Sequence, residues 1–308
     1  MANTIIKVEN LTKKFGPFTA VDNLNLEISE GEVFGLLGPN GAGKTTTIRM
    51  LSCLIAKTNG NATIGEFEIN KPSDHQKIRK MIGILPENVG LYEELSAYKN
   101  LDFFGRYYDC SPQLRKERIE YFLKEFGLWE KRNQSAGSFS KGMKQKLAIA
   151  RTLIHDPQII FLDEPTANLD PEAARLVIDY ILDLKKEQRT IILNTHMLDE
   201  AERICDRVGI LKTQLKAIDS PKKLEESLGG KKTVIVLTQV TPDIVSAIKN
   251  AGSWTVEVVN NQITIGVTNP EEENPLIDDV IHSSGGRLQS MTIVTSSLEE
   301  TYLNIVRS

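Results

Sequence analysis

One short segment constrains the fold of this chain more than any other: Gly38-Pro-Asn-Gly-Ala-Gly-Lys-Thr45 directly follows the apolar run at 33–37. Glycine adopts backbone conformations that other residues avoid, so Gly41 and Gly43 allow backbone N–H groups to turn inward. Lys44 then begins a helix, and a helix N-terminus favours negative charge. The segment therefore predicts a strand, a phosphate-binding loop and a helix, in that order.

The residue types of this loop suit a bound triphosphate. Lys44 is expected to neutralise the β- and γ-phosphates, and the Thr45 hydroxyl to bind Mg²⁺. The residues expected around the nucleotide are Gly38, Pro39, Asn40, Gly41, Ala42, Gly43, Lys44, Thr45 and Thr46. A glycine-rich turn with a solvated lysine is the simpler alternative.

A second motif argues against that alternative. Asp163-Glu164-Pro165 follows the apolar run at 159–162, and ligands of open α/β sheets bind at the C-terminal ends of the strands. Paired carboxylates there need a cation or hydrogen bonds. Asp163 is thus expected to hold Mg²⁺ through water, and Glu164 to act as the base for an attacking water. Without the phosphate loop, two acids at a loop entrance would be the simpler interpretation.

The order of apolar segments predicts the fold class. Brief, continuously apolar runs are typical of strands covered on both faces, and they occur at 33–37, 81–85, 159–162, 190–193 and 208–211. Helical patterns separate several of them, which favours a largely parallel α/β sheet. Shorter β-type segments at 5–8 and 24–28 precede the loop, and a charged, aromatic stretch between residues 96 and 133 predicts a helical insertion.

A different plan is predicted beyond a short helix at 221–230, where Gly229-Gly230 marks a plausible boundary. The expected elements are strands at 233–238, 254–259, 262–267 and 287–295 and helices at 243–251, 276–284 and 298–306. Strand-helix-strand-strand-helix-strand is the ferredoxin-like plan. Many functions share it, so it predicts an accessory domain and nothing more specific.

Composition excludes some functional classes. A formal net charge of −4 gives no broad basic field, so no nucleic-acid partner is expected. No apolar run approaches the roughly 20 residues that span a bilayer, and the N-terminus lacks the apolar core of a signal peptide. The three cysteines are scattered and form no metal-binding spacing. A cytosolic chain without a structural metal is expected.

A serine-glycine segment, Ser138-Phe-Ser-Lys-Gly-Met-Lys-Gln145, precedes a helical run, and Ser140 alone is most simply a helix N-cap. The same chain also carries the phosphate loop, the Asp163 motif, Ala167-Asn-Leu-Asp170 and Asn194-Thr-His196. In order and approximate spacing this set resembles the nucleotide-binding subunits of ABC transporters. The resemblance covers roughly residues 4–225.

The resemblance implies roles for individual residues. Phe15 matches the aromatic residue that stacks on adenine, although a core phenylalanine is the alternative. Ser140 and Gly142 match the signature segment, which reaches the γ-phosphate bound by the loop of a second copy. Asp170 matches the loop that couples the two sites. His196 matches the switch residue that contacts the γ-phosphate, where an ordinary polar cap is the alternative.

Two positions depart from the family pattern. Glu87 stands where the family usually has glutamine; its carboxylate can still approach Mg²⁺ or a bound water, but it adds negative charge beside the phosphates. The signature commonly reads leucine-serine-glycine-glycine-glutamine, whereas here Lys141 and Met143 flank the second glycine. Because serine and backbone N–H groups hold most of the phosphate, we expect function to survive these changes.

The fold class implied is an α/β P-loop NTPase core with a mostly parallel sheet, an N-terminal antiparallel β subdomain and a helical insertion at about 90–150. Residues 1–228 would form this ATP-binding domain, and residues 229–308 a small C-terminal α+β, ferredoxin-like domain.

The function implied is that of an ATPase with ATP and Mg²⁺ as cofactors. Its partners would be a second copy of itself or a similar ATPase subunit, and separate transmembrane permease subunits, on the cytoplasmic face of the cell membrane. The C-terminal extension favours export. A soluble ABC ATPase of a non-transport complex, such as iron-sulfur assembly, and a binding module that does not hydrolyse nucleotide are the alternatives.

Overall fold

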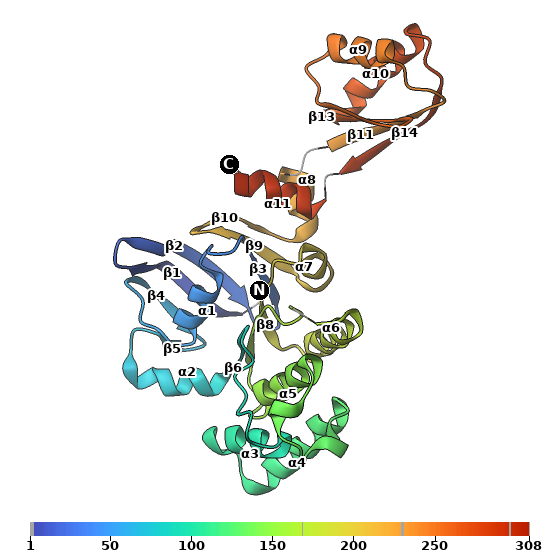
Figure 1. Ribbon diagram of the computed structural model, residues 1–308. Coiled ribbons are helices and arrows are strands. Elements are labelled where there is room, and N and C mark those ends of the chain that lie inside the picture. Colours follow the sequence, from blue (N-terminus) through green and yellow to red (C-terminus); the bar gives the residue numbers. More distant parts are fainter. Residues whose placement is uncertain (1–2, 168, 229–230, 296, 308) are drawn as a thin grey trace. The chain divides into compact units, whose positions relative to one another are not determined.

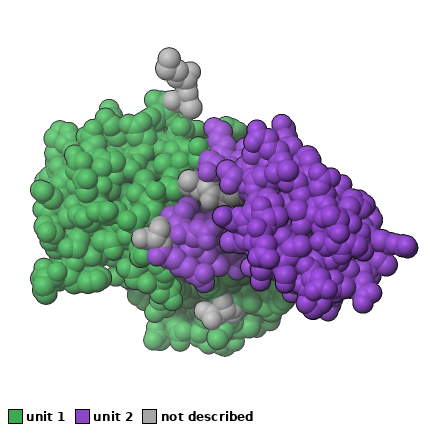
Figure 2. Space-filling view, turned by 90° about the horizontal axis from the view of Figure 1, so that it is seen from above, with its two compact units in different colours: residues 1–219 green, residues 220–308 purple. Residues whose placement is uncertain are grey.

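The computed structural model describes residues 3–167, 169–228, 231–295 and 297–307. The chain divides into two compact units, Met1–Asp219 and Ser220–Ser308, which Figure 2 colours green and purple. The described residues form three sheets, two in the first unit and one in the second. Each unit is built around its own hydrophobic core.

The central sheet of the first unit positions the candidate site. Its strand order is β10-β9-β3-β8-β7-β6, and every neighbouring pair is parallel except β9 and the edge strand β10. The strands are β3 (Val33–Leu37), β6 (Ile82–Leu85), β7 (Ile159–Asp163), β8 (Thr190–Asn194), β9 (Arg207–Lys212) and β10 (Gln214–Asp219). All residues of β3, β7 and β8 are buried, as their continuous apolar sequences predict. The predicted, mostly parallel α/β sheet is confirmed.

A second, antiparallel sheet has the order β2-β1-β4-β5. It contains β1 (Thr4–Phe15), β2 (Phe18–Ser29), β4 (Asn59–Ile64) and β5 (Phe67–Glu68). The first two strands are far longer than the predicted segments at 5–8 and 24–28, because irregularities of register break their apolar alternation. Asn10 and Asn23, with positive φ angles of 51° and 50°, lie within these two strands. The two sheets share one core, which includes Ile6, Leu24 and Phe34.

The helices of the first unit belong to two groups. One group accompanies the two sheets and comprises α1 (Lys44–Leu51), α2 (His75–Met81), α6 (Pro171–Lys186) and α7 (Leu198–Ile204). The other is the predicted insertion, with α3 (Ala97–Tyr107), α4 (Pro112–Glu125) and α5 (Lys141–Leu153), which gather at one end of the unit in Figure 1. Short 3₁₀ turns occur at Pro72–Asp74, Trp129–Lys131 and Ala136–Ser138. A serine caps the N-terminus of each insertion helix: Ser96, Ser111 and Ser140.

The second unit confirms the predicted order of elements. After α8 (Pro221–Leu228) come β11 (Lys231–Leu237), α9 (Pro242–Ala251), β12 (Val256–Val259), β13 (Gln262–Val267), α10 (Pro270–Ser283), β14 (Leu288–Thr295) and α11 (Leu298–Arg307). The sheet order β12-β13-β11-β14, with all pairs antiparallel, is the ferredoxin-like arrangement. Helix α10 begins at Pro270 rather than near the predicted residue 276. Pro275 lies inside the helix and does not mark its start. The expected boundary at Gly229-Gly230 lies outside the described residues.

No helix of the described ranges has both the length and the apolar composition that a membrane-spanning helix needs.

Candidate nucleotide-binding site

The loop between β3 and α1 has a backbone that requires glycine. φ is 81° at Gly41 and 101° at Gly43, in the left-handed region that other residues rarely adopt. A Cβ atom on Gly43 would lie 2.3 Å from the Ala20 carbonyl oxygen, and one on Gly38 would lie 2.2 Å from the Leu211 carbonyl oxygen. The predicted strand-loop-helix arrangement is therefore present, with no room for a side chain at Gly38 or Gly43.

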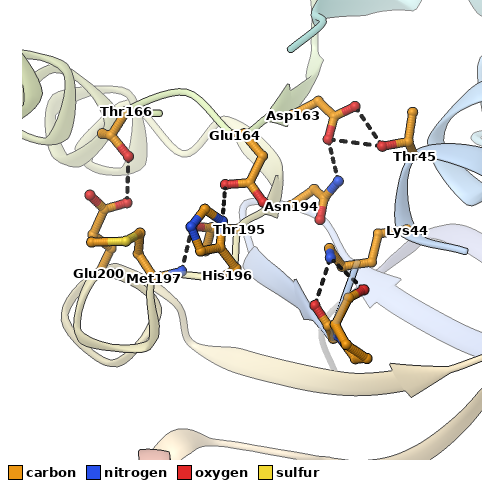
Figure 3. Close-up of polar contacts among 12 residues, drawn as sticks. Lys44, Thr45, Asp163, Glu164, Thr166, Asn194, Thr195, His196, Met197 and Glu200 are labelled. Atoms are coloured by element: carbon orange, nitrogen blue, oxygen red, sulfur yellow. Dashed lines mark hydrogen bonds and ion pairs between the residues drawn. The ribbon is translucent and has the colours of Figure 1, made fainter. Parts of the chain in front are cut away.

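Lys44 lies inside this loop. Its side-chain ammonium donates to the carbonyl oxygens of Gly38 at 2.6 Å and Pro39 at 3.2 Å (Figure 3). Only 7% of Lys44 is exposed. Burial lowers the pKa of the ammonium, while the carboxylates of Glu164, Asp163 and Glu87 oppose that shift. The loop thus holds one positive charge close to three carboxylates.

Asp163, at the end of β7, connects the loop to two neighbouring elements. The Thr45 hydroxyl, in the first turn of α1, donates to its two carboxylate oxygens at 2.9 and 3.2 Å. The Asn194 side-chain amide, at the end of β8, also donates to it (Figure 3). Burial raises the pKa of Asp163, and these two hydrogen bonds oppose the shift. Parallel strands therefore bring a hydroxyl, a carboxylate and an amide together at one edge of the sheet.

The donor set fits Mg²⁺, which prefers oxygen ligands and usually retains water or phosphate oxygens. The Thr45 hydroxyl oxygen and an Asp163 carboxylate oxygen lie 2.9 Å apart. The buried side-chain oxygen of Asn194 has no hydrogen-bond partner among the described residues. Glu87 lines the same pocket. No group of three histidine, cysteine or acidic residues in the described ranges is placed to hold a metal ion alone. The residues that would hold a magnesium ion here are Thr45 and Asp163, with Glu87 on the lining of the same pocket.

Glu164 and His196 form a second polar pair beside this group. His196 Nδ1 lies 2.8 Å from Glu164 Oε2 (Figure 3). The Glu164 side chain is 11% exposed and that of His196 is 57% exposed. The carboxylate is thus enclosed, while the imidazole faces the open side of the site.

A pocket of about 840 Å³ connects these groups, a volume within the usual range for ligand sites. Twelve of the predicted residues line it: Phe15, Asn40, Gly41, Ala42, Gly43, Lys44, Thr45, Thr46, Glu87, Asp163, Glu164 and His196. Phe15 is 49% exposed, so the alternative of a core phenylalanine is wrong. Gly38 and Pro39 contribute through their carbonyl groups, which bind Lys44.

The remaining predicted residues, Ser140, Gly142 and Asp170, are described by the structure but lie outside the lining of this pocket. The Ser140 hydroxyl accepts from the Met143 N–H at 3.3 Å, so the N-cap interpretation is confirmed. Asp170 caps α6 in the same way, accepting from Ala173 at 2.9 Å. A Cβ atom on Gly142 would lie 3.4 Å from the Ala173 Cβ. The signature segment therefore packs near Asp170, while Asn168 of the same motif lies outside the described residues.

Three further residues of this region were not predicted as site residues. Asn194 binds Asp163, and its position at the end of a strand that neighbours β7 was the available signal. Thr166 donates to the Glu200 carboxylate at 2.9 Å, and both line the pocket. Glu200 lies four residues after His196, but nothing in the local sequence indicates that it reaches Thr166.

Comparisons with known proteins agree with this geometry. The sequence model of a family described as ABC transporter matches residues 21–167. The chain is 32% identical over 309 residues to the linearmycin resistance ATP-binding protein LnrL of Bacillus subtilis, with 98% of each chain covered. It is 36% identical over 241 residues to the Nod factor export ATP-binding protein I of Cupriavidus metallidurans, covering 78% of this chain and 76% of the relative.

A solved structure is also similar to this chain. It is a dimeric ATP-binding cassette in a post-hydrolysis state, bound to ADP and phosphate. The TM-score is 0.64 at 29% identity, and the match covers 70% of this chain and 98% of that one.

Proposed function

The chain belongs to the ATP-binding subunits of ABC transporters, and we propose that two copies close around two Mg-ATP molecules to drive an exporter. It binds and hydrolyses ATP with Mg²⁺ as cofactor. One observation carries the proposal: the pocket contains Lys44, Thr45, Asp163 and Glu164, but Ser140 and Gly142 lie outside it. The signature segment is therefore left to meet a nucleotide bound by another copy.

Within one copy, the residues of the pocket have different roles in binding and hydrolysis. Lys44 and the loop amides bind the phosphates, and Thr45 and Asp163 would hold Mg²⁺, which supplies charge neutralisation at the phosphate oxygens. Glu164 accepts a proton from the attacking water. His196 lies 2.8 Å from the Glu164 carboxylate and is half exposed, and in the proposed mechanism it also contacts the γ-phosphate.

Between copies, closure completes each site. Ser140 and the N-terminus of α5 would present a hydroxyl and backbone N–H groups to the phosphate of the partner's nucleotide. Removing one well-placed donor of this kind usually lowers the rate by roughly 10²–10³-fold. Hydrolysis then removes the group that joins the two copies, and they separate.

The names of two relatives support the direction of transport that we propose. One is named for resistance to linearmycin and another for export of Nod factor, and the first aligns along 98% of both chains. Export, by separate membrane permease subunits with this chain peripheral on their cytoplasmic side, is therefore the function that we propose. The alternative of a soluble ABC ATPase in a non-transport complex receives no support from these relatives.

Replacement of the proposed base tests the dimer. In Glu164→Gln the pocket still binds nucleotide but hydrolysis is slow, so we expect ATP to convert the chain from monomer to dimer in size-exclusion chromatography. The double variant Lys44→Ala, Glu164→Gln is the control and should remain monomeric. A Glu164→Gln chain that is saturated with ATP and still monomeric would contradict the proposal.

Isolation from native membranes tests the partner. We expect the chain to co-purify with a protein that has several membrane-spanning helices. Recovery only with a non-membrane complex would instead favour the alternative function.

A further inference from the structure

The backbone at Glu164 adopts a conformation that needs external support. Its φ angle is 51°, in the left-handed region, where residues other than glycine are strained. Such residues persist at functional sites only when the surrounding structure holds them. One support is visible in β8, because the Glu164 N–H donates to the Asn194 carbonyl oxygen at 2.8 Å. The next two residues show what else holds this segment.

Gln145 holds Pro165 from the side of α5. Its side-chain amide donates to the Pro165 carbonyl oxygen at 2.6 Å, and Gln145 is only 6% exposed. Proline has no N–H group, so this carbonyl is the only backbone hydrogen-bonding group that Pro165 possesses. A buried bond to it therefore restricts the peptide directly after Glu164.

Thr166 is held from the third side. Its hydroxyl donates to the Glu200 carboxylate, on α7, at 2.9 Å, and Thr166 is 7% exposed. Three successive residues are thus bound to three different elements: Glu164 to β8, Pro165 to α5 and Thr166 to α7. Of the three elements, α5 is the one that begins in the signature segment.

We propose that Gln145 is a positioning residue that keeps the Glu164 carboxylate in place for proton transfer by binding the Pro165 carbonyl. The inference rests on the proposed function, because it takes Glu164 as the base. The hydrogen bond from Gln145 to Pro165 also connects the signature segment, at the start of α5, with the peptide that follows Glu164. Ser140 caps the same helix five residues before Gln145, a distance of about 7.5 Å along the axis. Contact of the signature segment with the partner's nucleotide is thereby transmitted to the base of the same chain.

The simpler interpretation is that Gln145 only satisfies a buried carbonyl and stabilises the fold. Helix α5 offers a matched control for this. Thr152, which is 3% exposed, also donates from α5; its hydroxyl lies 3.1 Å from the carbonyl oxygen of the strand residue Ile84 and 2.9 Å from that of Ala148 in its own helix. Loss of either donor leaves a buried carbonyl with one partner fewer, so both substitutions should lower the melting temperature. Only one of them releases the peptide beside Glu164.

Steady-state hydrolysis by Gln145→Met and Thr152→Val tests the proposal. Methionine matches glutamine in length and lacks the donor. We expect Gln145→Met to lower kcat by about tenfold or more, with the KM for ATP changed less than about twofold. Thr152→Val should keep its kcat. If Gln145→Met does not fold, Gln145→Asn, which retains the amide but is one methylene shorter, is measured in the same way.

A double-mutant cycle with Glu164→Gln separates the inference from the proposed function. Because Gln145 acts through Glu164, adding Gln145→Met to Glu164→Gln should reduce the residual hydrolysis no further and should leave the ATP-dependent dimer intact. If Glu164→Gln itself hydrolyses ATP normally, the proposed role of Glu164 as the base is wrong. If Glu164→Gln behaves as proposed but the two effects multiply, or Thr152→Val lowers kcat equally, the inference on Gln145 is overturned.

Discussion

Lys44 and Ser140 both bind a phosphate group in the proposed mechanism, yet the chain surrounds them very differently. Lys44 is buried and held by two carbonyl oxygens at 2.6 and 3.2 Å, close to Asp163 and Glu164. Ser140 is exposed, and its hydroxyl caps its own helix by accepting from Met143 at 3.3 Å. One half of the site is assembled within the chain, and the other half is presented outward.

The difference has a physical origin. Buried charges must be paired or hydrogen-bonded, so the Gly38 and Pro39 carbonyl oxygens hold Lys44, and the Thr45 and Asn194 side chains hold Asp163. An exposed helix N-terminus has no such requirement, because water satisfies its free N–H groups. It remains available for an anion from another molecule, as a site shared between two copies needs.

The largest effect is expected from Lys44→Ala. Removing the cation of the loop should lower ATP hydrolysis by roughly 10²–10³-fold or more, measured as phosphate release. Lys124→Ala is the control, since Lys124 lies on the surface of α4 and pairs with Glu120. If Lys44→Ala hydrolysed ATP as fast as this control, Lys44 would not be needed for hydrolysis, and the contrast drawn between Lys44 and Ser140 would be wrong.

A smaller but still large effect is expected from Ser140→Asp. Aspartate remains a good N-cap, so α5 should stay intact while a negative charge opposes the partner's phosphate. We expect roughly 10²-fold slower hydrolysis with an unchanged melting temperature. Ser111→Asp makes the same change at the N-cap of α4, where the hydroxyl accepts from Leu114 at 3.3 Å.

Equal hydrolysis by the Ser140→Asp and Ser111→Asp variants would show that Ser140 is a helix cap and nothing more. The signature segment would then play no part in phosphate binding.

The smallest effect is expected from Glu87→Gln, the change toward the family pattern. Glu87 lines the pocket, and its charge raises the pKa of Asp163, which burial has already raised. Removing one negative charge beside the phosphates should lower the KM for Mg-ATP by about two- to fivefold, most clearly at low salt. The exposed Glu66→Gln is the control, and a raised KM in Glu87→Gln alone would contradict the expectation.

The same comparison shows which parts of the site the sequence could predict. The phosphate loop, Asp163 and Glu164 were predicted because their chemistry is local: a few adjacent residues carry it, and the end of a strand places it. The contacts of Gln145 and Glu200 join residues 20 and 34 positions apart. Such pairs depend on how helices pack against the loop, which no local pattern specifies.

The fold shows the same limit. Runs buried on both faces, such as β3 and β7, were located almost to the residue. The long strands β1 and β2 were predicted only in part, since register shifts interrupt their alternation, and β4, β5 and β10 were missed. For Ser140 the local sequence indicated a helix cap, which is what the structure contains; its role toward a second copy remains a prediction.

Hydrolysis by a mixture of two inactive variants tests the shared site most directly. In a pair formed by one Lys44→Ala chain and one Ser140→Asp chain, one site combines the intact loop of the second chain with the intact signature segment of the first. Equal mixing makes half of the pairs mixed, each with one intact site of two, so we predict recovery of about a quarter of the wild-type rate. A mixture no more active than the average of the two variants measured alone would contradict the account.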